Sequence, residues 1–229
     1  MLADVHANLP ALEAVVEALR SRGVDRWVCA GDVVGYGPHP NECVARLREL
    51  DATTVLGNHD LIALGLLSDE RCIPLARTTL AWTSEVLSEE SRAWLGSLAR
   101  RVEQGELLLA HGSPEDPERY VARRSDALEV LAATHARTVV LGHTHRPLLV
   151  AEGGRLLLNP GAVGQSRERR AVARAAVLEL DTNRAVLVAV PYAVEQTRAA
   201  LRQQGLPDGG PHLRPSALRA TARALRALH

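Results

Sequence analysis

The stretch Thr138-Val139-Val140-Leu141-Gly142-His143-Thr144-His145 is a short apolar run that ends in two histidines. Such a run predicts a buried strand, and the histidines then lie at its carboxyl end. Four more clusters of metal-binding side chains either follow an apolar run or stand near the start of the chain: Asp4-Val5-His6, Gly31-Asp32, Gly57-Asn58-His59-Asp60 and His111-Gly112. Open α/β sheets bind ligands at the rim formed by the carboxyl ends of their strands, so we expect the five clusters to form one site.

Strands and helices alternate between the first cluster and His145. The apolar runs at residues 27–30, 53–56, 107–110 and 138–141 predict strands. A first helix is predicted between Asn8, which can cap its first turn, and Gly23, which stops it. Further helices are predicted at about 40–50, as two or three helices within 60–98, and at about 126–135. This alternation favours a mostly parallel sheet with right-handed crossovers.

The pattern changes after His145. Short runs at 147–151, 155–158, 171–180 and 185–190, separated by Gly- and Asn-containing turns at 152–154 and 181–183, predict an antiparallel meander. Two sheets packed face to face, with helices outside each, accommodate both halves of the chain. Helices are predicted again at 193–204 and 215–228. No linker divides the chain, so we expect an α/β fold in which residues 1–229 form a single domain, with a C-terminal helical extension at about 215–228.

The first predicted strand is short. Only Met1, Leu2 and Ala3 precede Asp4, although a strand that carries this cluster should lie in the centre of its sheet. A shortened central strand loses hydrogen bonds and apolar burial. From ordinary strand lengths we expect an apolar stretch of roughly four or five residues upstream of Met1.

Composition narrows the classes of function. Acidic and basic residues balance at 27 each, so no overall field favours nucleic acid, and an anionic ligand must be attracted locally. The basic residues other than His are all Arg, which excludes mechanisms that need a Schiff-base or P-loop lysine. The three cysteines have no paired spacing, and no apolar run approaches the length of a membrane span. We therefore expect a cytoplasmic protein that contacts no membrane and whose oligomeric state stays open.

The clusters supply carboxylate, imidazole and amide ligands, a set that suits Mn, Fe, Zn or Co. Two metal ions about 3.5–4 Å apart share a bridging oxygen ligand, and we assign this bridge to Asp32. Asp4 and His6 are two residues apart, so on a continuing strand both face the same side. The predicted ligands are Asp4, His6 and His145 for the first metal, and Asn58, His111 and His143 for the second.

His59 is the predicted catalytic residue. It directly follows the ligand Asn58, so it should not bind the same metal. A water held between two divalent ions loses a proton near neutral pH and becomes a nucleophile. His59 is then placed to protonate the leaving alkoxide or to stabilise the transition state.

The chain resembles the calcineurin-like metallophosphoesterases over about residues 4–170, in the order and spacing of all five clusters quoted above. The resemblance implies a four-layer αββα sandwich of two mixed sheets with flanking helices, and a binuclear metal centre that is often active with Mn²⁺. It implies the same seven metal ligands as the assignment above. The segment Asn159-Pro160-Gly161-Ala162-Val163-Gly164 is also similar to a loop of the small bacterial phosphodiesterases in this family.

Two positions depart from the Ser/Thr phosphatases of the family, which carry Gly-Asp-x-Val-Asp-Arg-Gly. Gly35 and Tyr36 replace the Asp that orients the catalytic histidine and the Arg that grips phosphate. The residue that orients His59 is therefore open. We expect Tyr36 to line the substrate pocket, where it can stack on a base, and Arg167 to reach a substrate phosphate. A packing role for Tyr36 and a solvated loop around Arg167 are the alternatives.

The sequence thus predicts a dinuclear metal-dependent phosphoesterase, and more specifically a phosphodiesterase in which a metal-bridging hydroxide attacks phosphorus. The expected cofactors are two divalent or trivalent metal ions, Mn²⁺ in vitro, with Fe, Zn, Co or Ni as alternatives. The expected substrate is a small-molecule or nucleotide phosphoester. One alternative is a phosphatase acting on phosphoprotein Ser/Thr or on dinucleoside polyphosphates. The other is a non-catalytic scaffold of the same fold, which eroded ligand positions would indicate.

Overall fold

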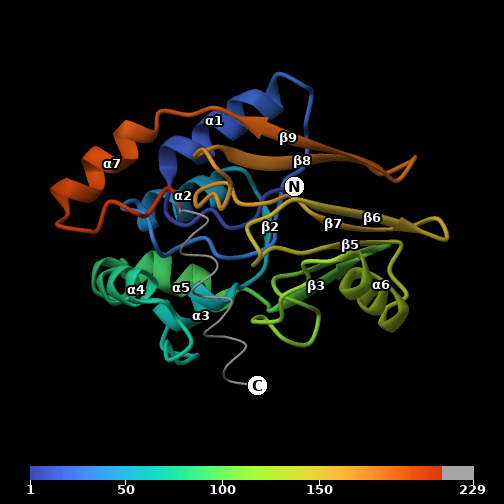
Figure 1. Ribbon diagram of the computed structural model, residues 1–229, viewed down its shortest axis with the longest axis horizontal. Helices are drawn as coiled ribbons and strands as arrows, with labels where there is room; N and C mark the ends of the chain where they lie inside the picture. The colour runs from blue at the N-terminus through green and yellow to red at the C-terminus, as the bar shows by residue number, and fades with distance from the viewer. Residues whose placement is uncertain (213–229) are drawn as a thin grey trace.

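The computed structural model describes residues 1–212 of the 229-residue chain (Figure 1). Its helices are α1 (Leu9–Arg20), α2 (Pro40–Glu49), α3 (Asn58–Ala63), α4 (Pro74–Val86), α5 (Glu89–Ser97), α6 (Arg124–Ala133) and α7 (Val194–Gln203). Its strands are β1 (Val28–Cys29), β2 (Thr53–Thr54), β3 (Arg101–Gln104), β4 (Leu107–Ala110), β5 (Thr138–Val140), β6 (Leu148–Glu152), β7 (Arg155–Asn159), β8 (Ala173–Glu179) and β9 (Arg184–Val190). The helix predicted at 215–228 lies outside the described residues.

The largest sheet of the described chain has the strand order β3-β4-β5-β7-β6. Its strands β4, β5 and β7 run parallel, whereas β3 and β6 are antiparallel strands at the two edges. Strands β1 and β2 pair in parallel, and β8 and β9 form an antiparallel hairpin. Helices flank these sheets (Figure 1). The prediction of an α/β fold with mixed sheets and flanking helices is confirmed.

The N-terminal segment links β1 to β8. Met1 and Ala176 of β8 exchange two backbone hydrogen bonds, of 2.8 and 3.0 Å. On the other side, Leu2 N donates to Val28 O (2.8 Å) and Ala30 N donates to Leu2 O (2.9 Å). The segment therefore lies centrally, between two strands, as expected. The upstream apolar stretch stays a prediction.

The predicted meander after His145 is wrong. The hairpins β6–β7 and β8–β9 do form, but they belong to different sheets. Strand β7 pairs in parallel with β5, because its apolar residues 156–158 align with residues 138–140. The chain then crosses toward the N-terminal segment, where Val163 N donates to Ala3 O (3.0 Å). The turn residues that predict a hairpin are local in sequence, so they do not predict which other strand the hairpin pairs with.

Successive residues of the central strands pack into different apolar clusters. Leu108 and Leu157 belong to a cluster that includes Val130 of α6, whereas their neighbours Leu109 and Leu158 belong to a second cluster. This second cluster also contains side chains from β1 and β8 and from residues next to strands or in the N-terminal segment: Ala3, Val28, Ala30, Val55 and Ala176. A third cluster joins side chains of β1 and β8 to α1 and α2. Because both faces of these strands are buried, they read as continuous apolar runs.

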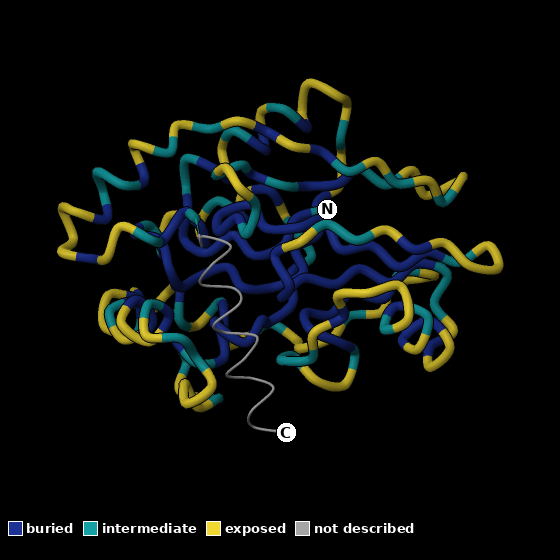
Figure 2. Tube along the Cα trace, viewed as in Figure 1, coloured by how far each residue is buried: buried dark blue, intermediate teal, exposed yellow. Residues whose placement is uncertain are grey.

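The buried segments run through the middle of the molecule, and the exposed ones lie at its periphery, in loops, in hairpin tips and on the outer sides of helices (Figure 2). The four-layer order itself, like the single domain over 1–229, stays a prediction. Within residues 1–212, no helix combines the length and apolarity that a membrane crossing requires.

The side chain of Asn8 connects the start of α1 to three distant segments through hydrogen bonds. Its Oδ1 caps α1 by accepting from Ala11 N (3.3 Å), as predicted, and also accepts from Thr197 Oγ1 of α7 (2.8 Å). Its Nδ2 donates to Gly164 O (2.7 Å) and to Tyr192 Oη (3.2 Å). Asn8 and Thr197 are buried, so these two side chains cannot bond to water instead.

We expect Asn8→Ala to lower the free energy of unfolding by about 2–4 kcal/mol, since it removes a helix cap and leaves buried partners unsatisfied. Asn41→Ala is the matched control. Asn41 also bonds backbone through both side-chain groups, to Val86 O and Ser88 N, but at the surface, and should cost about 1 kcal/mol or less. Urea unfolding measures both variants, and equal losses would contradict the expectation.

Candidate metal centre

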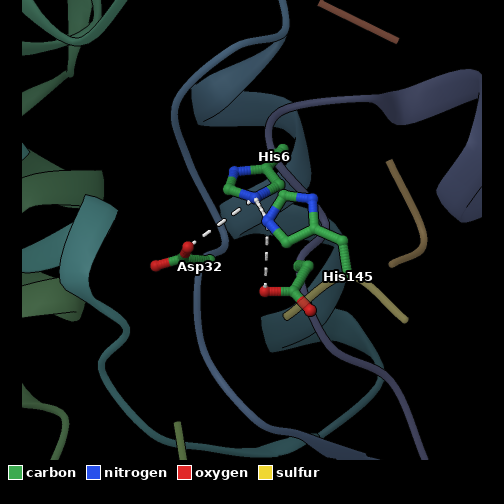
Figure 3. A group of neighbouring side chains, drawn as sticks. His6, Asp32 and His145 are labelled. Carbon is green, nitrogen blue, oxygen red and sulfur yellow. Dashed lines mark hydrogen bonds and ion pairs between the residues drawn. The ribbon is translucent and has the colours of Figure 1, made fainter. Parts of the chain in front are cut away.

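Four of the predicted metal ligands lie together in the buried interior. The ligand atoms of Asp4, His6, Asp32 and His145 all lie within 4.8 Å of one another. Figure 3 shows His6, Asp32 and His145 pointing toward one another. The Nε2 atoms of His6 and His145 are 3.0 Å apart, Asp32 Oδ2 is 3.6 Å from His6 Nε2, and Asp4 Oδ1 is 3.8 Å from His145 Nε2.

The other three predicted ligands form a second group. The amide oxygen of Asn58 lies 3.1 Å from His111 Nε2 and 3.0 Å from His143 Nδ1. His111 Nε2 is also 3.3 Å from Asp32 Oδ2. One carboxylate oxygen of Asp32 therefore faces both groups, with His6 on one side and His111 on the other.

Left-handed backbone brings these side chains together. Positive φ angles occur at Asp4 (54°), His6 (47°), Asp32 (53°), His143 (67°) and His145 (57°). This conformation is strained for residues other than glycine, and such strain is found mainly at functional sites. The expectation that Asp4 and His6 share a face because they continue a strand is wrong, since neither lies in a strand. Tight turns after the strands aim the ligands, and strand alternation does not.

Carbonyl groups fix which nitrogen of three histidines faces the site. Each ring approaches a backbone oxygen with its Nδ1: His6 at Val34 (3.1 Å), His111 at Ala30 (2.6 Å) and His145 at Gln165 (2.7 Å). Because a carbonyl oxygen only accepts, each Nδ1 carries the hydrogen. In the neutral rings the Nε2 lone pairs are then free to bind a metal.

Burial and neighbouring charge set the protonation of the group. Burial alone would raise the pKa of Asp32, but the surrounding imidazoles, His111 foremost, hold that pKa well below its usual range. Burial disfavours a charged His111, yet the Asp32 carboxylate outweighs it and raises the pKa of His111 to about 9. Burial lowers the pKa values of His6, His143 and His145 well below the usual value. A metal ion binds ionised carboxylates and neutral imidazoles, so metal binding here displaces the proton that Asp32 holds on His111.

Two buried carboxylate oxygens lack a hydrogen-bond partner among the described residues. They are Asp4 Oδ2 and Asp32 Oδ2. A buried polar group left unsatisfied costs about 1–3 kcal/mol, and more if it is charged. A cation satisfies both oxygens, and the mixture of carboxylate, imidazole and amide donors suits Mn, Fe, Zn or Co. The residues present therefore fit a metal centre.

His59 lies beside the first group of ligands. Its ring centroid is 4.8 Å from those of His6 and Tyr36, and its backbone N donates to Asp32 Oδ1 (2.8 Å). Its Nδ1 is buried, with no hydrogen-bond partner in the part of the chain that the structure describes. Burial lowers the pKa of His59 to about 4, against the attraction of Asp32. His59 is therefore a neutral imidazole at pH 7.

Gly35 packs directly against His59. Its φ is +88°, and a Cβ at this position would lie 2.5 Å from His59 Nδ1. The site therefore has no room for the carboxylate that orients the catalytic histidine in the Ser/Thr phosphatases. Close packing against Gly35 and Tyr36 holds the His59 ring instead.

Asp60 shapes the turn that presents Asn58. Its Oδ2 accepts from Gly57 N (2.9 Å) and its Oδ1 accepts from Val34 N (3.0 Å), so it ties the start of α3 to the loop after β1. Burial raises the pKa of Asp60 to about 7. No role was predicted for Asp60, although an acidic residue in the first turn of a helix is a recognised capping signal.

Gln165 was not predicted either. Its backbone oxygen and its Oε1 lie 2.7 and 2.9 Å from His145 Nδ1. It is fully buried, so the two contacts hold the imidazole in one orientation. Gln165 follows the segment 159–164 noted in the sequence, but no local pattern indicates a contact with a residue 20 positions earlier.

A pocket opens over the two groups of ligands, and both predicted substrate residues line it. Tyr36 is 2% exposed, because His6 and His59 cover its ring. Arg167 is half-buried and donates to Tyr120 Oη at 3.2 Å. The remaining lining residues include Arg71, Cys72, Ile73, Ala76, Glu118 and Tyr120. They come from two segments of the chain, 71–76 and 118–120.

Mixed sheets with flanking helices and a buried Asp/His group at the strand ends define a metallophosphoesterase. Residues 1–183 match the calcineurin-like phosphoesterase superfamily domain. The chain belongs to this superfamily of phosphoric ester hydrolases, as the sequence resemblance predicted.

Relatives are similar over most of the chain. It is 30% identical to an uncharacterised protein of Methanocaldococcus jannaschii, over 91% of this chain and 93% of that protein. It is 30% identical to phosphodiesterase YfcE of Escherichia coli, over 70% of this chain and 76% of that protein. The crystal structure of a metallophosphoesterase from Sphaerobacter thermophilus is similar with a TM-score of 0.80 and 36% identity, over 91% of this chain and 95% of that chain.

We expect Gly35→Ala to lower kcat on a phosphoester at least tenfold without loss of bound metal, because the new Cβ displaces His59. His59→Ala is the limiting case, with an expected loss of about 10²–10⁴. Gly65→Ala is the matched control, because Gly65 also has a positive φ (+75°) but no atom within 4 Å of the added Cβ. Steady-state rates and metal analysis test this, and equal activity of the Gly35 and Gly65 variants would contradict it.

Proposed function

We propose that this protein is a dinuclear metal-dependent phosphodiesterase. In this proposal the first metal is held by Asp4, His6, Asp32 and His145, and the second by Asp32, Asn58, His111 and His143. The fold is proposed to be the four-layer αββα sandwich, which the three apolar clusters support.

The supporting observation is the position of Asp32 Oδ2. This buried oxygen lies 3.6 Å from His6 Nε2 and 3.3 Å from His111 Nε2, between the two ligand groups. The pair of metal ions, when bound, activates the attacking water and neutralises charge that grows on the phosphoryl oxygens. The chain's own part is to fix three of the imidazoles through their Nδ1 atoms and to keep the Asp32 carboxylate ionised.

We assign the leaving-group step to His59, which lines the pocket with Asp32. A neutral imidazole donates a hydrogen bond to the departing oxygen. It donates a full proton only when a negative charge nearby raises its pKa from about 4. A bound phosphoester supplies such a charge, so both forms of assistance are open to His59.

A diester suits the pocket better than a monoester. A monoester dianion carries more charge, and the Arg that binds it in the Ser/Thr phosphatases is replaced by the buried Tyr36. Of the arginines lining the pocket, Arg71 is paired with Glu118 (3.1 Å), which leaves Arg167 to meet the substrate. Similarity to phosphodiesterase YfcE points the same way. The rival proposal is a phosphatase with the same metal ligands.

With Mn²⁺ bound, we expect a higher kcat/KM on bis-p-nitrophenyl phosphate than on p-nitrophenyl phosphate. A higher value on the monoester would favour the phosphatase. Chelation of the metal, or the variant Asp32→Ala, should remove hydrolysis together with bound metal, since both ions lose their shared ligand. Metal binding without hydrolysis of either ester would favour the alternative of a non-catalytic scaffold.

A further inference from the structure

The pocket has a second half that the metal ligands do not use. From the loop before α4 and from α4 itself come the apolar residues Cys72, Ile73 and Ala76. Tyr120 lines the pocket from the loop after β4. The ion pair Arg71–Glu118 (3.1 Å) connects these two walls. Next to the charged centre there is thus a slot with apolar side chains, an aromatic ring and a polar border.

Tyr120 is anchored at the boundary between the two halves. Its Oη accepts from Arg167 (3.2 Å), and its ring centroid lies 4.4 Å from that of His143 at an interplanar angle of 65°. Tyr120 nevertheless remains 40% exposed. An aromatic ring held at two points, with much of its surface free, is a ready platform for a flat group.

Tyr36 cannot serve as this platform. It is 2% exposed, and its ring packs against His6 and His59 at centroid distances of 4.8 Å each. The chain has three tyrosines and no Phe, and two of those tyrosines line this pocket. Tyr36 packs the catalytic side of the pocket, and Tyr120 is the ring that a ligand can reach.

We propose that Tyr120 and the apolar residues Cys72, Ile73 and Ala76 of the same pocket bind the base of a nucleotide whose phosphate reaches the metal centre. This inference rests on the proposed function and names its substrate class, a nucleotide phosphodiester. The nucleoside monophosphate that hydrolysis releases contains the same two groups, the phosphate and the base. The phosphate reaches Arg167 and the metal ligands, while the base stacks on Tyr120 and presents its polar edge to Arg71 and Glu118.

Equilibrium binding of AMP and of ribose 5-phosphate to the Mn²⁺-loaded protein tests this proposal, since ribose 5-phosphate keeps the phosphate and the sugar but has a hydroxyl in place of the base. We expect AMP to bind about tenfold or more tightly in the wild type. Tyr120→Leu should abolish this preference, with an affinity for ribose 5-phosphate within about twofold of that of Tyr120→Phe, since both variants lose the hydroxyl that accepts from Arg167. Tyr120→Phe keeps the ring, so it should retain the preference although it loses the hydroxyl that accepts from Arg167. Metal analysis of each variant checks that the contact with His143 has not altered the metal centre.

Two results would overturn the proposal. In the first, the wild type shows no preference for AMP over ribose 5-phosphate, including the case in which neither binds. In the second, Tyr120→Leu weakens the binding of both probes equally, as a structural role through His143 would.

Binding requires no turnover, so the nucleotide site and the phosphodiesterase function can be tested separately. If AMP is preferred through Tyr120 but no diester is hydrolysed, the proposed phosphodiesterase function is wrong and the proposed nucleotide site stands. If a diester is hydrolysed but AMP is not preferred, the proposed nucleotide site is wrong and the proposed function stands.

Discussion

The side chain of Asp32 is a carboxylate shielded from water at the centre of the molecule. Its negative charge must be compensated by hydrogen-bond donors or by positive charge. It is 1% exposed, its Oδ1 accepts from His59 N (2.8 Å), and its Oδ2 finds no hydrogen-bond donor within residues 1–212. An uncompensated buried charge costs several kcal/mol. The imidazoles of His6 and His111 approach that oxygen from opposite groups. In the proposed dinuclear centre, both metal ions would bind this oxygen and compensate its charge.

The need to compensate the charge of Asp32 also explains why the loops pack closely. A Cβ on Gly57 would lie 2.1 Å from Asp32 Oδ1, and a Cβ on Gly31 would lie 2.6 Å from Gly57 N. The glycines that precede Asp32 and Asn58 are therefore required for one loop to reach the other, in addition to any turn they form. The positive φ of Asp32 adds strain, which the buried hydrogen bonds of the turns offset.

The ligand types and their place at strand ends could be predicted from the sequence, because apolar runs such as 107–110 are buried on both faces and give a clear signal. The edge strand β3 was missed because Arg101, Glu103 and Gln104 are exposed and show no apolar alternation. The roles of Gln165 and Tyr120 depend on contacts with His145 and His143 from distant parts of the chain. No local pattern records such contacts, nor the left-handed turns that aim the ligands.

Anomalous scattering from crystals grown with Mn²⁺ tests the shared carboxylate most directly. We expect two peaks per chain, one beside His6 and His145 and one beside Asn58 and His111, with Asp32 Oδ2 within bonding distance of both. A single peak, or two well-occupied ions that both lie away from Asp32, would contradict the assignment of Asp32 as the bridge.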